Sequence, residues 1–539
     1  MDHLVIVPIV LPLLAGAAMV LLGERRRNAK AALGLVSTLA LLVVAVVLLQ
    51  LANSPADEGP PALRVYLLGN WPSLFGIVLV ADRLAAMMLV LTSLLGLAAL
   101  VFSFARWHRA GIHFHPLVQF QLMGLNGAFL TGDLFNLFVF FEVMLAASYG
   151  LAMHGSGTAR VRAGLHYIAI NLTASLLFLI GVSLIYAVAG TLNMADLATR
   201  IPRIASQDRA LLEAGAAVLG VAFLIKAAMW PLGFWLPTTY AVASAPSAAL
   251  LSILSKVGVY AVLRLWLLLF GEGAGDVAGF GGTWLLAGGL ATIAFGSIAV
   301  LATQDMSRLA GACVLVSSGT LLAAIGTGKV AVTGGALLYL ASSVLAIGAF
   351  FLLIELIERG REVGADVLAV TREAFGEGEE EEPEEEVGVA IPATMAILGM
   401  SFMGCALVLA GMPPLSGFLA KFAMLAPLLP LAAAGGGEGG VPAASWALIA
   451  ALILSGLATV VAMIRTGINT FWAATDGVVP RVGLIEIAPV ALLLSLCVGL
   501  TVGAGPAMDY MQATAWSLHA PQDYVRAVLS APRTGEGGG

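Results

Sequence analysis

Charged residues are scarce in this chain: they make up 11% of its 539 residues, whereas hydrophobic residues make up 60%. A typical soluble domain has about 25% charged residues. Apolar runs recur from Leu4 to Val502, and most approach the roughly 20 residues that a helix needs to cross a bilayer. The alternating pattern of a membrane β-barrel is missing. These features exclude a soluble globular fold and predict an all-α polytopic membrane protein.

Cysteine is also rare, with 3 residues, and each lies inside an apolar run: Cys313, Cys405 and Cys497. Buried thiols behave mainly as small hydrophobic groups, so we expect neither a disulfide framework nor a metal site. The sequence has no phosphate-binding loop, no dinucleotide glycine motif and no cluster of Cys and His with metal-ligand spacing. We therefore expect no cofactor and no enzymatic reaction. The net charge of −6 gives no indication of a nucleic-acid partner.

The apolar runs predict about fourteen transmembrane helices. We place these helices at 4–22, 31–52, 79–104, 112–130, 133–153, 164–189, 211–243, 245–270, 281–303, 307–327, 332–358, 390–430, 444–466 and 484–506. Two of these runs are too long for one crossing and contain paired prolines, which remove backbone hydrogen bonds. The runs at 211–243 and 390–430 are therefore predicted to be discontinuous helices.

The loops indicate the orientation of the chain. The first run has no basic residues before it, and Arg25–Arg27 follow it, so we interpret it as a retained helix and not a cleaved signal. Arginine and lysine are concentrated in alternate loops, which is typical of the cytoplasmic side. We expect a multi-pass protein of the bacterial cytoplasmic membrane with both termini outside the cytoplasm. The acidic segment within 359–389 predicts a disordered cytoplasmic loop. Attraction of cations by this segment is an alternative.

Four ionisable residues lie near the middle of apolar runs: Glu142, Lys226, Lys256 and Lys421. A charge at the bilayer centre costs about 2.5–3.5 kcal/mol or more, so such residues usually face a protein interior and serve a proton or ion pathway. The alternatives are a static ion pair and a lysine that reaches the interface. His166 is a weaker candidate, because a histidine near a helix start is more often structural.

The two predicted breaks each have a lysine beside them. Lys226 precedes the break in FLIKAAMWPLGFWLP, and Lys421 follows the break in AGMPPLSGFLAKF. The broken helices are an odd number of crossings apart, as inverted repeats require, and such repeats place ion sites near interrupted helices. We expect repeats at 112–270 and 281–466, preceded by three helices in 1–111 and followed by a last helix and tail in 484–539.

Glu142 has only apolar and aromatic neighbours in TGDLFNLFVFFEVMLAASYG, so it needs a partner from another helix. We expect this partner to be Lys226, because an ion pair would satisfy both charges. Burial disfavours the charged form of a lysine and a nearby carboxylate favours it. Movement of Glu142 could therefore make Lys226 release or accept a proton.

These segments resemble a known family. FVFFEVM, IKAAMWPLGFWLP, SAPSAALLSILSKVGVY and GMPPLSGFLAKF are similar to the signature segments of the antiporter-like membrane subunits of respiratory complex I and of Mrp-type cation/proton antiporters. YLLGNWPSLFGIVLVADRLAA, SLIYAVAGTLNMADLA and DYMQATAWSLHAPQDYVRAVL resemble the D subunits of bacterial Mrp antiporters. The likeness extends over nearly the whole chain.

The resemblance implies a hydrated polar axis made of Glu142, Lys226, Lys256 and Lys421. It also implies a complex with other Mrp subunits, in a lipid bilayer, that exchanges sodium, lithium or potassium for protons. The sequence differs from complex I relatives at Ser317, Ser318 and Ser342, where those proteins often have histidine. Hydroxyls can orient water but carry no charge at neutral pH. We therefore expect the relay between Lys256 and Lys421 to use water and serines.

Two other functions remain open at this point. The chain could be a proton-pumping membrane subunit of an NADH–quinone oxidoreductase-type complex, in which redox proteins elsewhere drive the same axis. It could also be a scaffold whose buried charges only hold helices together.

Overall fold

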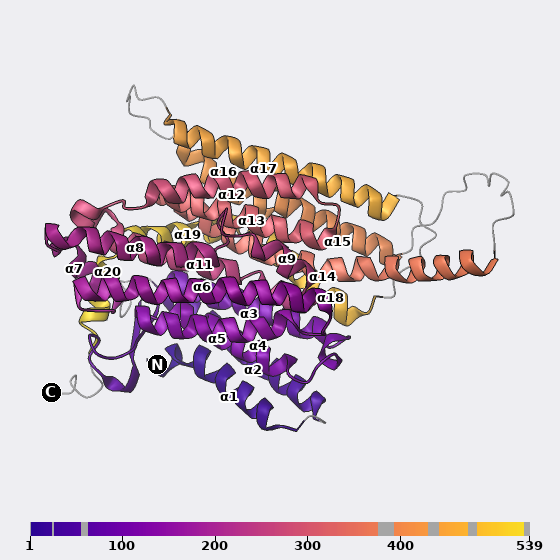
Figure 1. Cartoon of the computed structure of the whole chain (residues 1–539), viewed down its shortest axis with the longest axis horizontal. Coiled ribbons are helices and arrows are strands. Elements are labelled where there is room, and N and C mark those ends of the chain that lie inside the picture. The colour runs from indigo at the N-terminus through magenta and orange to yellow at the C-terminus, as the bar shows by residue number, and fades with distance from the viewer. Residues whose placement is uncertain are drawn as a thin grey trace.

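The computed structural model describes residues 2–23, 26–54, 63–375, 393–429, 441–472 and 482–532. Most of its long helices lie side by side in roughly one direction (Figure 1). The helices are α1 (Val7–Leu21), α2 (Arg27–Ala52), α3 (Arg83–Ser103), α4 (Phe114–Leu130), α5 (Leu134–Ala152), α6 (Thr158–Ala189), α7 (Met194–Arg200), α8 (Ser206–Lys226), α9 (Trp235–Val242), α10 (Ala245–Leu251), α11 (Leu254–Phe270), α12 (Gly282–Ala302), α13 (Met306–Gly326), α14 (Val330–Phe375), α15 (Ala393–Ala410), α16 (Ser416–Leu425), α17 (Ala443–Gly467), α18 (Leu484–Val502), α19 (Ala504–His519) and α20 (Gln522–Leu529).

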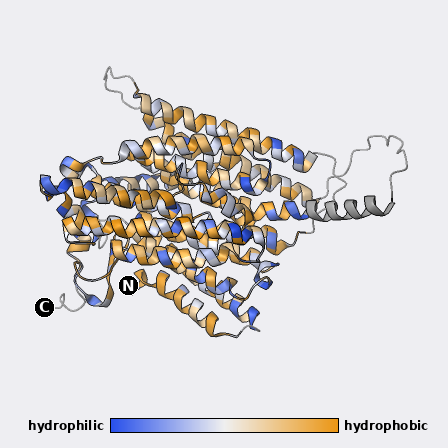
Figure 2. Ribbon diagram, viewed as in Figure 1, coloured by the Kyte–Doolittle hydropathy of each residue, from blue (hydrophilic) through white to orange (hydrophobic). Residues whose placement is uncertain are grey.

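The predicted fold class is confirmed. In the described part of the chain, 11 helices are long and apolar enough to cross a membrane, and two shorter apolar helices accompany them. Hydrophobic residues line the helices along their length, and hydrophilic residues gather toward their two ends (Figure 2). The chain is therefore a polytopic helical membrane protein. The count of fourteen crossings stays a prediction.

Both predicted breaks are present. The run at 211–243 forms α8 and α9, which are separated between Lys226 and Trp235. The run at 390–430 begins to be described at 393 and forms α15 and α16, separated between Ala410 and Ser416. Proline lacks a backbone N–H and clashes with the preceding helical turn, so the helix cannot continue through either segment.

One predicted helix start was wrong. The helix expected at 79–104 starts later, because Val78–Ala81 forms strand β2, antiparallel to β1 (Arg64–Leu67). The Asp82 carboxylate then caps α3 by accepting a hydrogen bond from the Ala85 N–H. The predicted helix at 245–270 is confirmed as one candidate span, within which a short interruption separates α10 from α11. The C-terminal tail contains α19 and α20, which the apolar pattern alone did not indicate.

The predicted loop at 359–389 also differs from the structure, because α14 continues to Phe375. The residues after Arg359 include alanine, leucine, glutamate and arginine, which all favour helix. The rest of the acidic segment, 376–389, lies outside the described residues.

α14 is the most enclosed helix, and its most apolar 18-residue window is completely buried. It packs against α13, α16, α18 and α19. The span 245–270, which contains α10 and α11, and the helix α13 are almost as enclosed, since 94% of the corresponding window is buried in each. The helices around Lys256 and Lys421 therefore meet in the interior, away from the exposed faces of α2 and α17.

Candidate functional site

The break between α8 and α9 positions Lys226. Lys226 is the last residue of α8, and its side chain is 6% exposed. Its ammonium nitrogen lies 5.0 Å from the centroid of the Phe141 ring, a cation–π contact. The indole N–H of Trp235 donates to the Ile225 carbonyl at 3.2 Å, so a carbonyl near the break has a partner. Trp235 thus stabilises the break, whereas Trp230 is 44% exposed.

Glu142 lies on α5 and has its hydrogen-bond partner on α6. The Ser175 hydroxyl donates to Glu142 Oε1, and the Ser175 side chain is buried. The expected ion pair with Lys226 was wrong for this structure, because among the described residues no carboxylate oxygen lies within 4.0 Å of Lys226. Phe141, whose ring the Lys226 ammonium contacts, is the residue that precedes Glu142 on α5. The hydrogen bond that satisfies Glu142 therefore comes from a neutral donor on a third helix.

A small cavity lies beside Lys226. Its volume is about 10 Å³, and Tyr167 and Asn171 from α6 contribute to its lining together with Lys226. This is near the minimum space that one water molecule needs, and a buried water needs two to four polar partners. The Tyr167 hydroxyl is also 2.6 Å from the Ser148 hydroxyl. The site can therefore hold a single water next to the lysine ammonium group.

Lys256 is completely buried on α11. Its ammonium nitrogen donates to the Ser318 hydroxyl on α13 at 3.2 Å. Gly258 explains how α11 comes close to the first break: a Cβ at this position would lie 2.4 Å from the Ala227 nitrogen and 2.8 Å from the Lys226 carbonyl carbon. The missing side chain lets the Lys256 helix pack directly on the backbone next to Lys226.

Serine hydroxyls occupy the space between Lys256 and the second break. Ser318 contacts Lys256, and its neighbour Ser317 donates to the Ser343 hydroxyl at 3.0 Å. Ser342 in turn lies 2.7 Å, between hydroxyl oxygens, from Ser416, the first residue of α16. All five serines are at most 3% exposed. This region contains the three serines that the sequence analysis named, Ser317, Ser318 and Ser342. The structure adds two more, Ser343 and Ser416.

Lys421 lies on α16, after the second break, and is 7% exposed. Its ammonium nitrogen donates to the Ala410 carbonyl at 2.8 Å, and Ala410 is the last residue of α15. A helix end leaves carbonyls without intrahelical partners, so this lysine satisfies one of them. A carbonyl near the first break accepts a hydrogen bond from an indole N–H, whereas a carbonyl at the second break accepts one from the lysine itself.

Replacing Gly411 with alanine is expected to displace Lys421. Gly411 has a φ of +74°, and a Cβ there would lie 2.5 Å from Lys421 Cδ and 3.0 Å from its nitrogen. We expect the melting temperature of the protein to fall, because the added methyl group would displace the Lys421 side chain from the Ala410 carbonyl, and overpacking costs about 1–3 kcal/mol in the free energy of unfolding. Gly404→Ala is the matched control, since its Cβ would meet Leu494 at an ordinary 3.6 Å. Equal melting temperatures in both variants would contradict the assigned position of Lys421.

The structure does not bring His166 to the other candidates. His166 is exposed, and its Nδ1 lies 3.0 Å from the Arg162 carbonyl on the same helix. Sequence reasoning also missed Tyr167, Asn171, Ser175, Ser343 and Ser416. Hydroxyl and amide side chains are common in membrane helices. Their presence in an apolar run therefore did not distinguish these residues from other polar residues of the chain.

Comparison with known proteins decides the family. Residues 131–433 match the family described as "NADH:quinone oxidoreductase/Mrp antiporter, TM". This is more than half of the chain and includes Glu142, Lys226, Lys256 and Lys421. The chain belongs to this antiporter family.

Curated members of the family are similar over the whole chain. The chain is 60% identical to the D subunit of a probable K(+)/H(+) antiporter of Rhizobium meliloti, with 99% of each chain covered. It is 33% identical to the D subunit of an Na(+)/H(+) antiporter of Alkalihalophilus pseudofirmus, covering 98% of this chain and 100% of the relative. The predicted resemblance to the D subunits of such antiporters is therefore confirmed.

The fold matches chains of solved membrane complexes. A chain in the structure of the Mrp complex from a Dietzia species superposes with a TM-score of 0.79 at 24% identity, covering 98% of this chain and 100% of that one. A chain of respiratory complex I from Thermus thermophilus gives a TM-score of 0.73 at 21% identity, covering 98% and 100%. At these identities, the two matches establish the shared fold.

Proposed function

We propose that this chain conducts protons as the D subunit of a multi-subunit antiporter that exchanges a cytoplasmic monovalent cation for external protons. The proposed path runs from Glu142 through Lys226 and Lys256 to Lys421. Its partners are the other subunits of an Mrp-type complex and the lipid bilayer. Both termini lie on the non-cytoplasmic side, and 112–270 and 281–466 form the two inverted repeats.

The observation that carries the proposal is the environment of the three buried lysines. Within the described ranges, Lys226, Lys256 and Lys421 take part in none of the ion pairs. Their neighbours are an aromatic ring, a hydroxyl and a carbonyl. A purely structural buried charge is normally paired, because a lone one is costly. Lysines with neutral partners are better suited to taking up and releasing protons.

Potassium is the first cation to test. The relative named as belonging to a probable K(+)/H(+) antiporter is 60% identical, whereas the relative named as belonging to an Na(+)/H(+) antiporter is 33% identical. Exchange by the complete complex in vesicles, measured with potassium and sodium side by side, is expected to show faster potassium exchange. Equal rates would remove the preference without affecting proton conduction.

Replacing Glu142 with glutamine is expected to lower exchange about 10-fold or more. The amide keeps the shape and can still accept from Ser175, but it no longer provides a charge to Lys226, and positioned proton-transfer groups contribute about 100-fold or more. The measurement is cation-driven proton movement in vesicles that contain the whole complex. Ser175→Ala serves as the matched variant, and we expect a smaller loss there because the carboxylate charge remains. Full activity of Glu142→Gln would refute a role in conduction.

A second candidate function is that of a proton-pumping subunit. Redox reactions in other subunits of the same complex would then drive the pump. The observation that favours it is a 32% identity to the N subunit of an NADH-quinone oxidoreductase of Desulforudis audaxviator, covering 87% of this chain and 86% of the relative. Purification of the native complex distinguishes the two. Small membrane partners without redox cofactors support the antiporter, and copurifying flavin or iron–sulfur proteins support the pump.

A further inference from the structure

A stripe of buried polar residues leads from Lys256 toward one end of the molecule. Lys256, Tyr260 and Arg264 are spaced four residues apart on α11 and are 0%, 3% and 7% exposed. Residues at this spacing share one face of a helix, with Cβ atoms about 5–6 Å apart. Arg264 Nη2 donates to the Tyr260 hydroxyl at 3.3 Å. Arg264 and Tyr260 are therefore hydrogen-bonded to each other, and Lys256 is the next polar residue on the same face of α11.

The Tyr260 hydroxyl is held from two sides. It accepts from Arg264 and donates to the Phe129 carbonyl in the last turn of α4 at 2.5 Å. The ring of Phe129 contacts the ring of Tyr260 with centroids 4.9 Å apart. A hydroxyl that both accepts and donates is the kind of group that can hand a proton on while keeping its own net charge.

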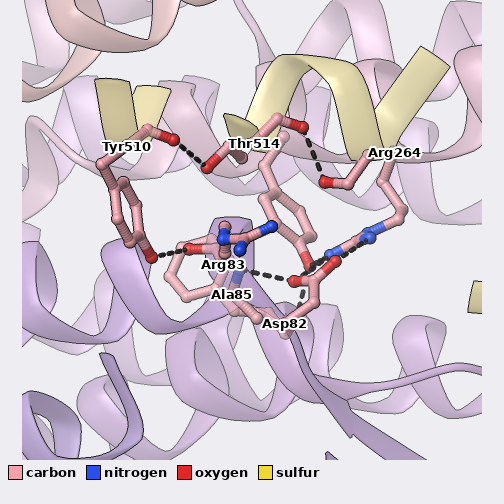
Figure 3. A network of polar contacts seen from close by, with 9 residues as sticks. Asp82, Arg83, Ala85, Arg264, Tyr510 and Thr514 are labelled. Carbon is pink, nitrogen blue, oxygen red and sulfur yellow. Dashed lines mark hydrogen bonds and ion pairs between the residues drawn. The ribbon is translucent and has the colours of Figure 1, made fainter. Parts of the chain in front are cut away.

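Asp82 and Arg264 form the outer end of the stripe. Arg264 donates from both terminal nitrogens to the two Asp82 oxygens, at 2.5 and 2.7 Å, and Asp82 also caps α3 through Ala85 (Figure 3). The side chains of Arg264 and Asp82 are 8% and 13% exposed. A carboxylate in a bidentate pair with arginine is fixed in its ionised form. Asp82 is therefore a positioning residue here and not a proton carrier.

The pair borders a cavity of about 500 Å³, which gives solvent access to the Arg264 end of the stripe, whereas Tyr260 lies behind the pair and not in the lining. Asp82 and Arg264 line it together with Tyr524 and Arg526 of α20. The Arg264 guanidinium also lies 5.3 Å from the centroid of the Tyr524 ring. This end of α11 lies with the β1–β2 hairpin and α20, on the side that the loop charges predict to be non-cytoplasmic.

We propose that this stripe is the non-cytoplasmic half of the proton path and that the Tyr260 hydroxyl relays protons between outer solvent and Lys256. The inference rests on the proposed antiporter function. In each step, water passes a proton from the cavity, past the Asp82–Arg264 pair, to the Tyr260 oxygen. Tyr260 releases the hydroxyl proton that it had donated to the Phe129 carbonyl, and this proton passes, directly or through one water, to the neutral Lys256 amine. The products are water, unchanged Tyr260 and the Lys256 ammonium. Asp82 fixes the Arg264 guanidinium, which in turn positions the Tyr260 hydroxyl by donating a hydrogen bond to it.

This assignment makes Lys256 the branch point of the path. On one side it donates to Ser318, the first of the serines that lead toward Lys421. On the other side, the next polar residue on the same face of its helix is Tyr260. External protons would thus reach the axis at its middle lysine, and the serines would connect that lysine to the second break.

The test is Tyr260→Phe in the complete complex in vesicles, with pH varied on each side separately. The ring keeps its packing on Phe129, while the relay hydroxyl is lost. We expect exchange to fall at least 10-fold and to become insensitive to pH on the non-cytoplasmic side, with unchanged half-saturation for the cytoplasmic cation. Tyr510→Phe is the matched control, because Tyr510 donates to the Arg83 carbonyl at 2.7 Å in the same network but lies outside the stripe (Figure 3).

Two results would overturn the inference. One is unchanged dependence on outer pH in an assembled Tyr260→Phe complex, even with lower thermal stability, because it would assign the hydroxyl to packing alone. The other is loss of the response to cytoplasmic pH, which would place the stripe on the wrong side. If Tyr260→Phe fails to assemble, 3-fluorotyrosine at position 260 preserves the contacts and acidifies the hydroxyl, and an unaltered outer pH profile would then refute the relay.

Failure of this inference can be told apart from failure of the proposed function. The Glu142→Gln variant is measured in the same vesicles. If it and the wild type exchange equally, proton conduction along the axis is refuted whatever Tyr260→Phe does. If it loses exchange while Tyr260→Phe keeps both its rate and its outer pH profile, only the route through Tyr260 is wrong.

Discussion

Replacing Lys256 with arginine is expected to stop cation/proton exchange although the positive charge is kept. Arginine remains protonated under all physiological conditions, so it cannot alternate between charged and neutral forms. Lys256 is completely buried and donates to the Ser318 hydroxyl at 3.2 Å. We expect the exchange rate to fall about 100-fold or more, the usual contribution of a positioned acid–base group.

The measurement is exchange in vesicles with the amount of assembled complex determined in parallel. Ser318→Ala removes the hydroxyl contact but leaves the amine able to bind and release a proton, so we expect a smaller loss. If Lys256→Arg retains more than half of the wild-type rate, the positive charge alone is sufficient. Lys256 would then be part of a scaffold, the third function that the sequence left open.

Replacing Asp82 with alanine is expected to destabilise the protein more than any change in an exposed ion pair. The variant leaves the 7%-exposed Arg264 without its carboxylate. Removing one partner of a buried pair costs about 3–5 kcal/mol in the free energy of unfolding. The control is Asp276→Ala, because Asp276 pairs with Arg209 at 2.7 Å but is 75% exposed. Exposed pairs contribute about 0–1 kcal/mol, so thermal unfolding in detergent should distinguish the two variants clearly.

The contribution of this pair also depends on pH. Burial alone would raise the pKa of Asp82, but the charge and hydrogen bonds of Arg264 outweigh it and lower the pKa below its ordinary value of 3.8. The folded state therefore binds the Asp82 proton less tightly than the unfolded state, and the stabilisation is present above pH 3.8. It is lost as pH falls through the lower folded pKa. A difference between wild type and Asp82→Ala that grows on acidification would contradict this assignment.

The periodic and compositional features of the sequence predicted the elements well. Long apolar runs can be satisfied in a bilayer only as helices, because every backbone N–H and C=O must find a partner. The paired prolines predicted both breaks correctly, because proline lacks a backbone N–H and prevents the helix from continuing. The short strands and the C-terminal helices α19 and α20 were missed. They depend on contacts such as Tyr510 with the Arg83 carbonyl, which link residues more than 400 positions apart.

The sequence allowed us to predict which residues belong to the candidate site, but not which residues they contact. A lysine or glutamate in an apolar run is costly enough to indicate a functional position from the sequence. The partner of each such residue is chosen by helix packing. Glu142 was expected to pair with Lys226 and instead accepts from Ser175 on α6, while Lys226 contacts the Phe141 ring. The sequence does not record which faces of α5, α6 and α8 meet.

The sequence by itself determined that this protein is a helical membrane protein with two broken helices, four ionisable residues within apolar runs and the segments of an antiporter family. Hydrophobicity, proline geometry and the cost of buried charge act locally and can be read from a linear chain. Only the tertiary structure decided that five serines lie between Lys256 and the second break and that the Tyr260 hydroxyl is held between Arg264 and the end of α4. A hydrogen bond of about 3 Å depends on how distant helices pack, and packing is a property of the whole fold.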